Sequence, residues 1–246
     1  MEALKAQLKE ILCREGAEKW GVADFSALLP YGFPRGVSVA VSLPRHMVEE
    51  LKEGPTREYY YLYKELNARL DRIITAGARF LEGMGYESRA ITSDHTQFID
   101  PYRSVLPHKT AARLAGLGRI GKNGLLITPE YGAAVRLSTL LTKAPLTPDK
   151  PLEGEVCGDC RLCAEICPAG ALHGESWREG KERDEILDAP TCFACQKEQM
   201  MSRFGLDSDL CGRCFALCPH TRRSASAPIL RSRSGSPDSH TALPVR

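Results

Sequence analysis

Cysteine is the residue type in this chain whose number and spacing most clearly indicate chemistry. Nine of the ten cysteines lie between residues 157 and 218, and only Cys13 stands apart. The opening segment MEALKAQLKEILCREGAEKW has apolar residues at helical spacing among charges, which predicts an amphipathic helix and no export signal. In a reducing compartment, clustered thiols bind metal or carry out redox chemistry more often than they form disulfides. We therefore expect a cytoplasmic protein whose cysteines bind a metal centre.

The most specific motif is the run CGDCRLCAEICP at residues 157–168, which has the spacing C-x2-C-x2-C-x3-C-P. Bacterial ferredoxins use such a run to bind a 4Fe-4S cluster through the first three cysteines, and the fourth ligates a second cluster. A second run, CGRCFALCP at residues 211–219, repeats the same ending but is one cysteine short. Cys192 or Cys195 can supply the missing ligand, so the chain has the eight cysteine ligands that two 4Fe-4S clusters need.

In this crossed ligation, the last cysteine of each run binds the cluster that is held mainly by the other run. It predicts which cysteines share a cluster. One cluster is expected on three cysteines of the first run and the last cysteine of the second: Cys157, Cys160, Cys163 and Cys218. The other is expected on the remaining cysteines of both runs and one from the segment between them: Cys167, Cys211, Cys214 and either Cys192 or Cys195. A zinc ribbon is the alternative, but a zinc site uses four ligands and not an interlocked set of eight. Cys13 has no partner cysteine near it and is expected to be a small core residue.

A glycine-rich loop, GLGRIGKNG at residues 116–124, precedes the cysteine runs. A dinucleotide-binding motif would need a strand before it and an acidic residue about 20 positions later, but a helical pattern precedes it and Leu141 stands where the acid should be. A phosphate-binding P-loop would need Ser or Thr at the position of Asn123. What remains is a tight turn in which the backbone closely approaches either a bulky cofactor or packed structure.

The elements that position these residues follow from the hydrophobic pattern. Residues 37–43 (VSVAVSL) have the β-branched composition of a buried strand, and apolar residues recur every three or four positions from 56 to 84, as in a long helix with one buried face. Further strands and one short helix are predicted along the chain: strands at 86–92, 125–128 and 135–141, and the helix at 109–117. The N-terminal part therefore has the pattern of an α/β (α+β) domain.

Three prolines between residues 144 and 151 suggest a domain boundary. We predict an α/β cofactor-binding domain at 1–146, a double 4Fe-4S module at 147–221, and a disordered tail rich in Ser, Arg and Pro at 222–246. The net charge of +2 provides no field that would attract nucleic acid. No apolar run approaches the roughly 20 residues that span a bilayer, so no membrane partner is expected.

With these motifs in view, residues 99–219 resemble the epoxyqueuosine reductase family and its shorter relatives. The resemblance is carried by AARLAGLGRIGKNGLLI at 111–127, by LTKAPL at 141–146 and by the cysteine runs. It implies a nitroreductase-like, cobalamin-binding α/β domain followed by a small module similar to bacterial ferredoxins. Family members use the clusters to reduce the cobalt, which then removes an oxygen from a modified tRNA base.

The resemblance also implies roles for individual residues. It places four residues of the glycine loop near the corrinoid: Gly118, Gly121, Lys122 and Asn123. It puts the proton-donating aspartate at Asp100, a role that suits a carboxyl whose pKa is raised by burial; an ordinary turn residue before Pro101 is the alternative. It favours Cys192 over Cys195 as the cluster ligand. Independently of the resemblance, His108 could be an axial ligand or an acid-base group, but a packed or surface histidine is the favoured interpretation.

The chain also departs from the family pattern. PYRSVLPHK follows Asp100 where the family has a small residue and then Pro-Val-Leu-Glu, and Arg119 stands where a tryptophan is usual. These departures weaken the expectation of a tRNA substrate. We expect an iron-sulfur oxidoreductase whose two 4Fe-4S clusters pass single electrons from a ferredoxin- or flavodoxin-type donor to a corrinoid, for reductive chemistry on an unknown substrate. The alternatives are a non-catalytic, ferredoxin-type electron-transfer protein that serves a partner enzyme, and a reductase that uses flavin.

Overall fold

A four-stranded sheet forms the centre of the protein in a computed structural model, which describes residues 2–226. The strand order is β1-β2-β8-β3, and every neighbouring pair is antiparallel. The two central strands are the longest and carry most of the buried residues. The bounds are β1 (Lys19–Asp24), β2 (Arg35–Ser42), β3 (Ser88–Ile91) and β8 (Val135–Thr142).

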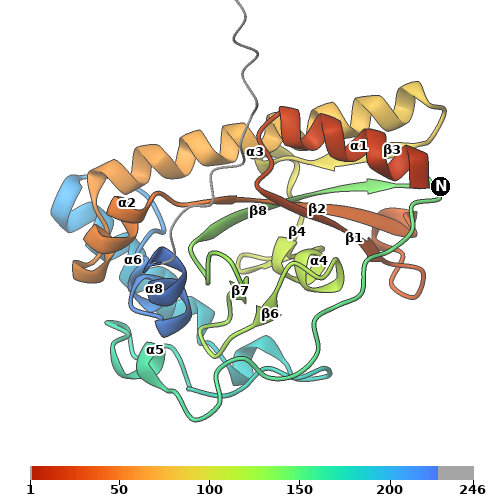
Figure 1. The fold of residues 1–246 in the computed structure, drawn as a ribbon. Coiled ribbons are helices and arrows are strands. Elements are labelled where there is room, and N and C mark those ends of the chain that lie inside the picture. Colours follow the sequence, from red (N-terminus) through yellow and green to blue (C-terminus); the bar gives the residue numbers. More distant parts are fainter. Residues whose placement is uncertain (1, 227–246) are drawn as a thin grey trace, which may run out of the picture.

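Helices cover both faces of this sheet. Figure 1 shows α1 (Glu2–Arg14) and α3 (Arg57–Gly83) on one face, with α4 (His108–Leu114) on the other. The long helix α3 begins where the Thr56 hydroxyl accepts the backbone N–H of Tyr59 at 3.0 Å, which satisfies a donor left free at the helix start. Two small hairpins lie beside α4, built from the short strands β4 (Phe98–Asp100), β5 (Arg103–Ser104), β6 (Arg119–Ile120) and β7 (Leu126–Ile127).

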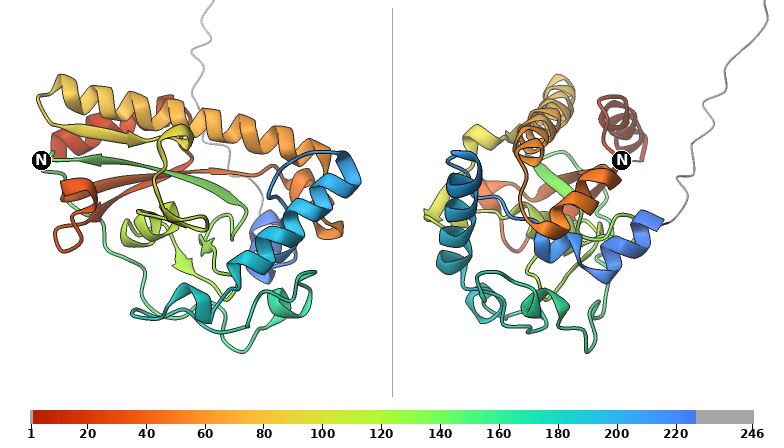
Figure 2. Two further views of the ribbon diagram at one scale, coloured as in Figure 1. Left: turned by 180° about the vertical axis from the view of Figure 1, so that it is seen from behind. Right: turned by 90° about the vertical axis from the view of Figure 1, so that its left-hand side faces the viewer.

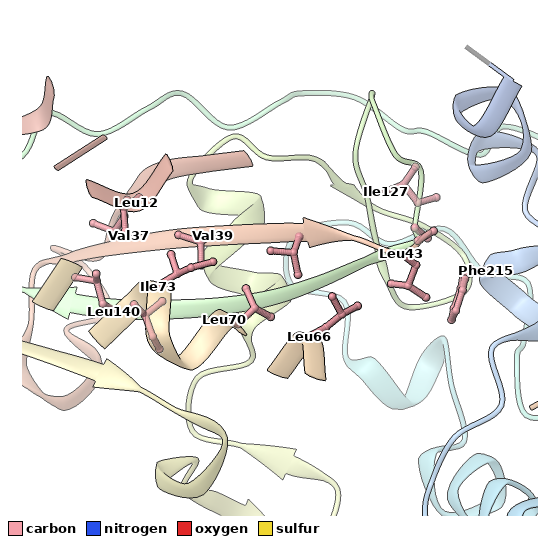
Figure 3. Packing of buried hydrophobic residues seen from close by; sticks show 14 of the residues in the cluster. Leu12, Val37, Val39, Leu43, Leu66, Leu70, Ile73, Ile127, Leu140 and Phe215 are labelled. Atoms are coloured by element: carbon pink, nitrogen blue, oxygen red, sulfur yellow. The ribbon is translucent and has the colours of Figure 1, made fainter. Parts of the chain in front are cut away.

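The main hydrophobic core lies between the sheet and the helices α1 and α3. Figure 3 shows Leu12 of α1 and Leu70 and Ile73 of α3 packed against Val39 and Leu140 of the two central strands. Each of these side chains is at most 2% exposed, and burying one contributes about 1.5–3 kcal/mol to stability. This packing makes the sheet a rigid support for the loops on its other face.

The cysteine-rich part of the chain contains several short helices and one long one. It wraps around one side and one end of the sheet, as the views in Figure 2 show. Its helices are α5 (Leu162–Glu165), η4 (Arg183–Glu185), α6 (Ala189–Phe204), α7 (Arg213–Ala216) and α8 (Pro219–Ser226). The remaining short helices lie in the N-terminal part: η1 (Pro30–Gly32), α2 (Arg45–Glu50), η2 (Leu51–Glu53) and η3 (Ser93–His95).

The two parts of the chain share one core. Helix α7 packs against η2, and the Phe215 ring lies 6.2 Å from the Tyr59 ring of α3, edge to face. Phe215 and Cys218 belong to the same buried cluster as Leu43 and Leu66. The cysteine helices are therefore held in place by the α/β part, while the domain boundary at residue 146 stays a prediction.

The predicted mixed α/β class is confirmed, and the predicted helices and strands of the N-terminal part are present. Strand β1 was missed because its sequence, KWGVAD, shows no alternation of apolar and polar residues. The expectation that Cys13 is a core residue is wrong: it is exposed, because the buried stripe of α1 consists of Leu4, Leu8 and Leu12.

The predicted tail, residues 222–246, overlaps the end of helix α8. Helix α8 continues through residues 222–226, starting with an Arg222 N–H that donates to the Cys218 carbonyl at 3.0 Å. The rest of that prediction, residues 227–246, lies outside the described residues. Within the part of the chain that the structure does describe, no helix combines the length and the apolar character needed to cross a bilayer.

Candidate iron-sulfur centre and adjoining groove

Four cysteines line one small cavity. Its volume is about 270 Å³, and the four are Cys157, Cys160, Cys163 and Cys218. The pKa of the Cys163 thiol is raised to about 11, mainly by burial and in part by the charges of the other three thiols. The fold thus gathers the four cysteines that the crossed ligation assigns to one cluster, although Cys218 is far from the others in sequence. We refer to this set as the first cysteine group.

The remaining five cysteines of the two runs and of α6 form a second group: Cys167, Cys192, Cys195, Cys211 and Cys214. Burial raises the pKa of Cys192 to about 11, with further contributions from Cys167, Cys211 and Cys195. Burial also raises the pKa of the Cys214 thiol, and the charges of Cys211 and Cys192 add to this increase. Cys163 of the first group acts on Cys214 as well, so the two groups are close together.

Helix α6 brings both alternative ligands to the second group, because residues three positions apart lie on the same side of a helix. Each sulfur also receives a side-chain amide from the next turn. Gln196 Nε2 donates to Cys192 Sγ at 3.1 Å, and Gln199 Nε2 donates to Cys195 Sγ at 3.2 Å. The geometry therefore leaves both cysteines as candidate ligands.

The donor set fits an iron-sulfur cluster. Thiolates are soft ligands that suit such clusters, and raised thiol pKa values mean that metal binding must displace protons. Within residues 2–226, no group of three or more Cys, His, Asp or Glu side chains has the arrangement needed to hold a single metal ion. The sulfurs instead surround a cavity.

Two residues of the glycine loop face the first cysteine group. The backbone N–H of Lys122 donates to Cys157 Sγ at 3.4 Å, and Lys122 Nζ donates to the Gly158 carbonyl at 2.6 Å. Asn123 is 5% exposed and lines the cysteine cavity. Its Oδ1 accepts the N–H of Leu125, whereas its Nδ2 is buried with no partner. An unpaired N–H donor beside this cavity suits a group with electron-rich sulfur atoms, because such sulfurs accept hydrogen bonds.

The two glycines that the family resemblance places near a corrinoid make room for close packing against Ile127. A Cβ atom on Gly118 would lie 2.4 Å from the backbone oxygen of Ile127, and one on Gly121 would lie 2.4 Å from the Ile127 side chain. Neither glycine lines a described cavity. The close approach predicted for this loop is therefore to β7.

A larger groove adjoins the cysteines. It consists of a first lobe of about 570 Å³ and a second lobe of about 900 Å³. The two lobes share four lining residues: Arg113, Ile120, Trp177 and Lys181. The Arg113 guanidinium lies 4.6 Å from the centre of the Trp177 ring. Lys122 lines the second lobe as well as contacting Cys157, so the loop separates the groove from the first cysteine group.

Two neighbouring residues at the start of α4 line the first lobe with strongly shifted pKa values. Burial lowers the pKa of His108 to about 4, and its Nδ1 lies 3.0 Å from Thr139 Oγ1. Burial and the nearby charge of Arg183 lower the pKa of Lys109 to about 8. Lys109 Nζ donates to the Gly124 carbonyl at 2.6 Å. The sequence did not single out Lys109, because nothing in its local pattern indicates that α4 begins inside a cavity.

Asp100 lies at the edge of the groove and not inside it. Its Oδ1 accepts the backbone N–H of Tyr102 at 2.8 Å, and its Oδ2 lies 3.4 Å from Arg103 Nε. The Asp100 side chain is 41% exposed, so it lacks the burial that would raise the pKa of a carboxyl group. Its neighbours Ile99 and Tyr102 line the first lobe. The contacts of Asp100 are those of a turn residue, the alternative given by the sequence.

Comparisons with known proteins bear on this arrangement. No protein-family model matches the chain. It is 38% identical over 111 residues to the epoxyqueuosine reductase of Listeria monocytogenes and 32% identical over 114 residues to that of Bacillus subtilis. The predicted resemblance to epoxyqueuosine reductases is confirmed. These matches cover 45% and 46% of the chain but only 28% and 29% of the relatives, so the chain spans less than a third of their length.

Epoxyqueuosine reductases are not the only similar proteins. The tetrachloroethene reductive dehalogenase of Sulfurospirillum multivorans is 35% identical over 114 residues, which are 44% of this chain and 22% of the dehalogenase. The solved epoxyqueuosine reductase of Streptococcus thermophilus aligns with a TM-score of 0.58 at 22% identity, over 89% of this chain and 66% of that one. The catabolic reductive dehalogenase NpRdhA aligns with a TM-score of 0.67 at 20% identity, over 87% and 31%. These structures show a shared fold.

Proposed function

We propose that this protein is an iron-sulfur oxidoreductase that passes single electrons through two 4Fe-4S clusters to a corrinoid bound in the groove. One observation supports this most directly. Lys122 contacts a sulfur of the first cysteine group through its backbone and lines the groove. A cluster on one side of this loop and a corrinoid on the other would be separated by one residue, Lys122. The similar proteins are reductases by name, and one solved dehalogenase is described as B12-dependent.

The cysteines would hold the clusters in the crossed arrangement. The first group would hold one cluster, and Cys167, Cys211 and Cys214 with Cys192 would hold the other. A cluster supplies one electron at a time at a potential set by charge, hydrogen bonds and solvent exposure. The protein's own contribution is to bury the sulfurs and to direct N–H donors at them, from Lys122 in the first group and from Gln196 in the second.

The second lobe has features that suit a corrinoid. The edge of a corrin ring carries amide groups, which both donate and accept hydrogen bonds. Cationic and carboxylate side chains both line this lobe, among them Arg119, Arg161, Glu153 and Glu155. The Nε of Arg119 is buried without a hydrogen-bond partner, which leaves a donor available to a ligand. Arg119 replaces the tryptophan usual in the family, so this contact would be particular to this chain.

We further propose that a ferredoxin- or flavodoxin-type protein supplies the electrons, in the cytoplasm. A protein donor of this kind transfers one electron at a time, as the clusters require.

Anaerobic purification with and without added cobalamin or flavin tests this function. The expected result is about eight iron atoms per chain and a corrinoid spectrum retained through gel filtration. Retention of flavin alone would indicate a flavin-using reductase. Retention of neither would indicate a non-catalytic electron carrier. Zinc in place of iron would overturn the redox assignment altogether.

A further inference from the structure

The charged residues that line the first lobe all carry the same sign. Six are lysine or arginine, and within the described residues no aspartate or glutamate lines it. The six are Arg103, Lys109, Arg113, Arg136, Lys181 and Arg183. A cavity of this size with an all-cationic lining has a positive potential that attracts anions.

Three of the six cations are neutralised by carboxylates that lie outside the lobe. Arg103 and Arg183 both pair with Asp184, and Lys181 lies 3.1 Å from Glu175. These pairs close the side of the lobe that is formed by the cysteine-rich part. Their charges are already balanced, so they contribute little to an incoming ligand.

The other three cations, Lys109, Arg113 and Arg136, form no ion pair with any residue in 2–226. The Arg113 guanidinium lies over the face of Trp177. Arg136 donates to Asn67 Oδ1 at 3.0 Å and lies 4.1 Å from the Tyr63 ring. Each of these cations therefore keeps a charge that no carboxylate balances.

Lys109 is the most constrained of the three. Among the described residues it makes one side-chain hydrogen bond, to the Gly124 carbonyl, although an ammonium group has three donors. Burial already works against its charge, as the lowered pKa of about 8 shows. A buried charge without a partner destabilises a protein unless a ligand balances it. The aromatic rings of Tyr59, Trp177 and Phe215 line the same lobe.

We propose that the first lobe is a binding site for an organic anion, a carboxylate or phosphate carried on a flat apolar body, with Lys109 and Arg113 as its charged contacts. The aromatic walls would contact the apolar body. The site goes beyond the proposed electron transfer, since binding an anion requires no electron; only the corrinoid as the source of the anion rests on the proposed function. The anion can belong to a substrate or to the phosphate of a corrinoid's nucleotide loop.

Calorimetric titration of the cluster-loaded protein with benzoate and with benzamide tests the site, because the two probes have the same shape and differ in charge. Benzoate is expected to bind at least about tenfold more tightly than benzamide, the ratio that corresponds to one additional charge contact. Lys109→Met and Arg113→Met should each weaken benzoate binding by about tenfold and leave benzamide binding unchanged. Equal affinity for the two probes, or unchanged benzoate binding in both variants, would overturn the proposal.

Arg89→Met is the matched control, because Arg89 stacks at 4.6 Å on Tyr31 and lines neither lobe. It removes one positive charge and should leave benzoate affinity unchanged; an equal loss there would reveal non-specific attraction and contradict the site. Iron content and circular dichroism show whether each variant is folded.

A competition experiment identifies the source of the anion. If cobalamin displaces benzoate and cobinamide, which lacks the phosphate, does not, the lobe takes the corrinoid phosphate; if benzoate binds beside cobalamin, the lobe takes a separate anionic ligand.

Discussion

Asn123 Oδ1 accepts a hydrogen bond of 3.1 Å from the backbone N–H of Leu125. This contact fixes the orientation of the side-chain amide, so that its Nδ2 is the atom left buried without a partner. The amide lies beside the cavity lined by the first cysteine group. Because cluster sulfurs accept hydrogen bonds, a donor held in this position would stabilise the more negative, reduced cluster and raise its reduction potential.

Asn123→Leu removes that donor while keeping a side chain of similar size. We expect the midpoint potential of one cluster to fall by on the order of 40 mV, which corresponds to about 1 kcal/mol for one hydrogen bond. The other cluster should keep its potential. A potentiometric titration followed by electron paramagnetic resonance measures both transitions in the same sample.

Gln196→Met provides the matched comparison. It removes the amide that donates to Cys192 Sγ, so it should lower the potential of the second cluster and leave the first unchanged. If Asn123→Leu shifted neither transition, or both equally, the Asn123 amide would not act on the cluster.

The second cluster has two candidate ligands on α6, and iron analysis separates them. The family resemblance favours Cys192, so Cys192→Ala should lose about four of about eight iron atoms, one cubane cluster. Cys195→Ala should keep the full iron content. The opposite pattern would assign the ligand to Cys195, and full loading of both variants would mean that either sulfur can serve.

The cysteine spacing was enough to predict the grouping of Cys157 with Cys218, because crossed ligation is a property of the motif itself. It could not separate Cys192 from Cys195, since one turn of α6 brings both to the same place. The regular spacing of apolar residues predicted α3 and the central strands, because each of these elements has a buried face. It did not predict the cavity position of Lys109, the partnerless amide of Asn123 or the exposure of Asp100, which depend on contacts between distant segments.

Gly132 is predicted to be essential for docking α8, the helix that follows Cys218. A Cβ atom at Gly132 would lie 2.4 Å from the backbone of Thr221, and the residue has a φ of +59°. Gly132→Ala should therefore destabilise the protein by about 2 kcal/mol, from backbone strain and overpacking together. Thermal unfolding and iron content should both show the loss.

Gly83→Ala is the control for this substitution. Gly83 is the last residue of α3 and has open space where a Cβ would stand, so alanine there should leave the melting temperature unchanged or raise it slightly. If Gly132→Ala were equally harmless, the contact between Gly132 and Thr221 would not hold α8 in place.

The lowered pKa of Lys109 leads to a prediction about pH. Its value of about 8 lies below the usual lysine pKa of 10.5, so between these two values the unfolded chain binds more protons at this position than the folded protein does. Stability associated with Lys109 therefore increases as pH rises from about 8 toward 10.5, and below pH 8 the buried charge destabilises the fold.

Lys109→Met should accordingly raise the melting temperature at pH 7, and its advantage should shrink as pH approaches 10.5. Melting curves of the wild-type protein and the variant, recorded from pH 7 to 10.5 without ligand, measure this difference. Benzoate should reduce the advantage of the variant at pH 7, because an anion bound beside Lys109 stabilises the charged form. A variant that was less stable than wild type at pH 7 would show that the Gly124 hydrogen bond outweighs the desolvation of the ammonium group.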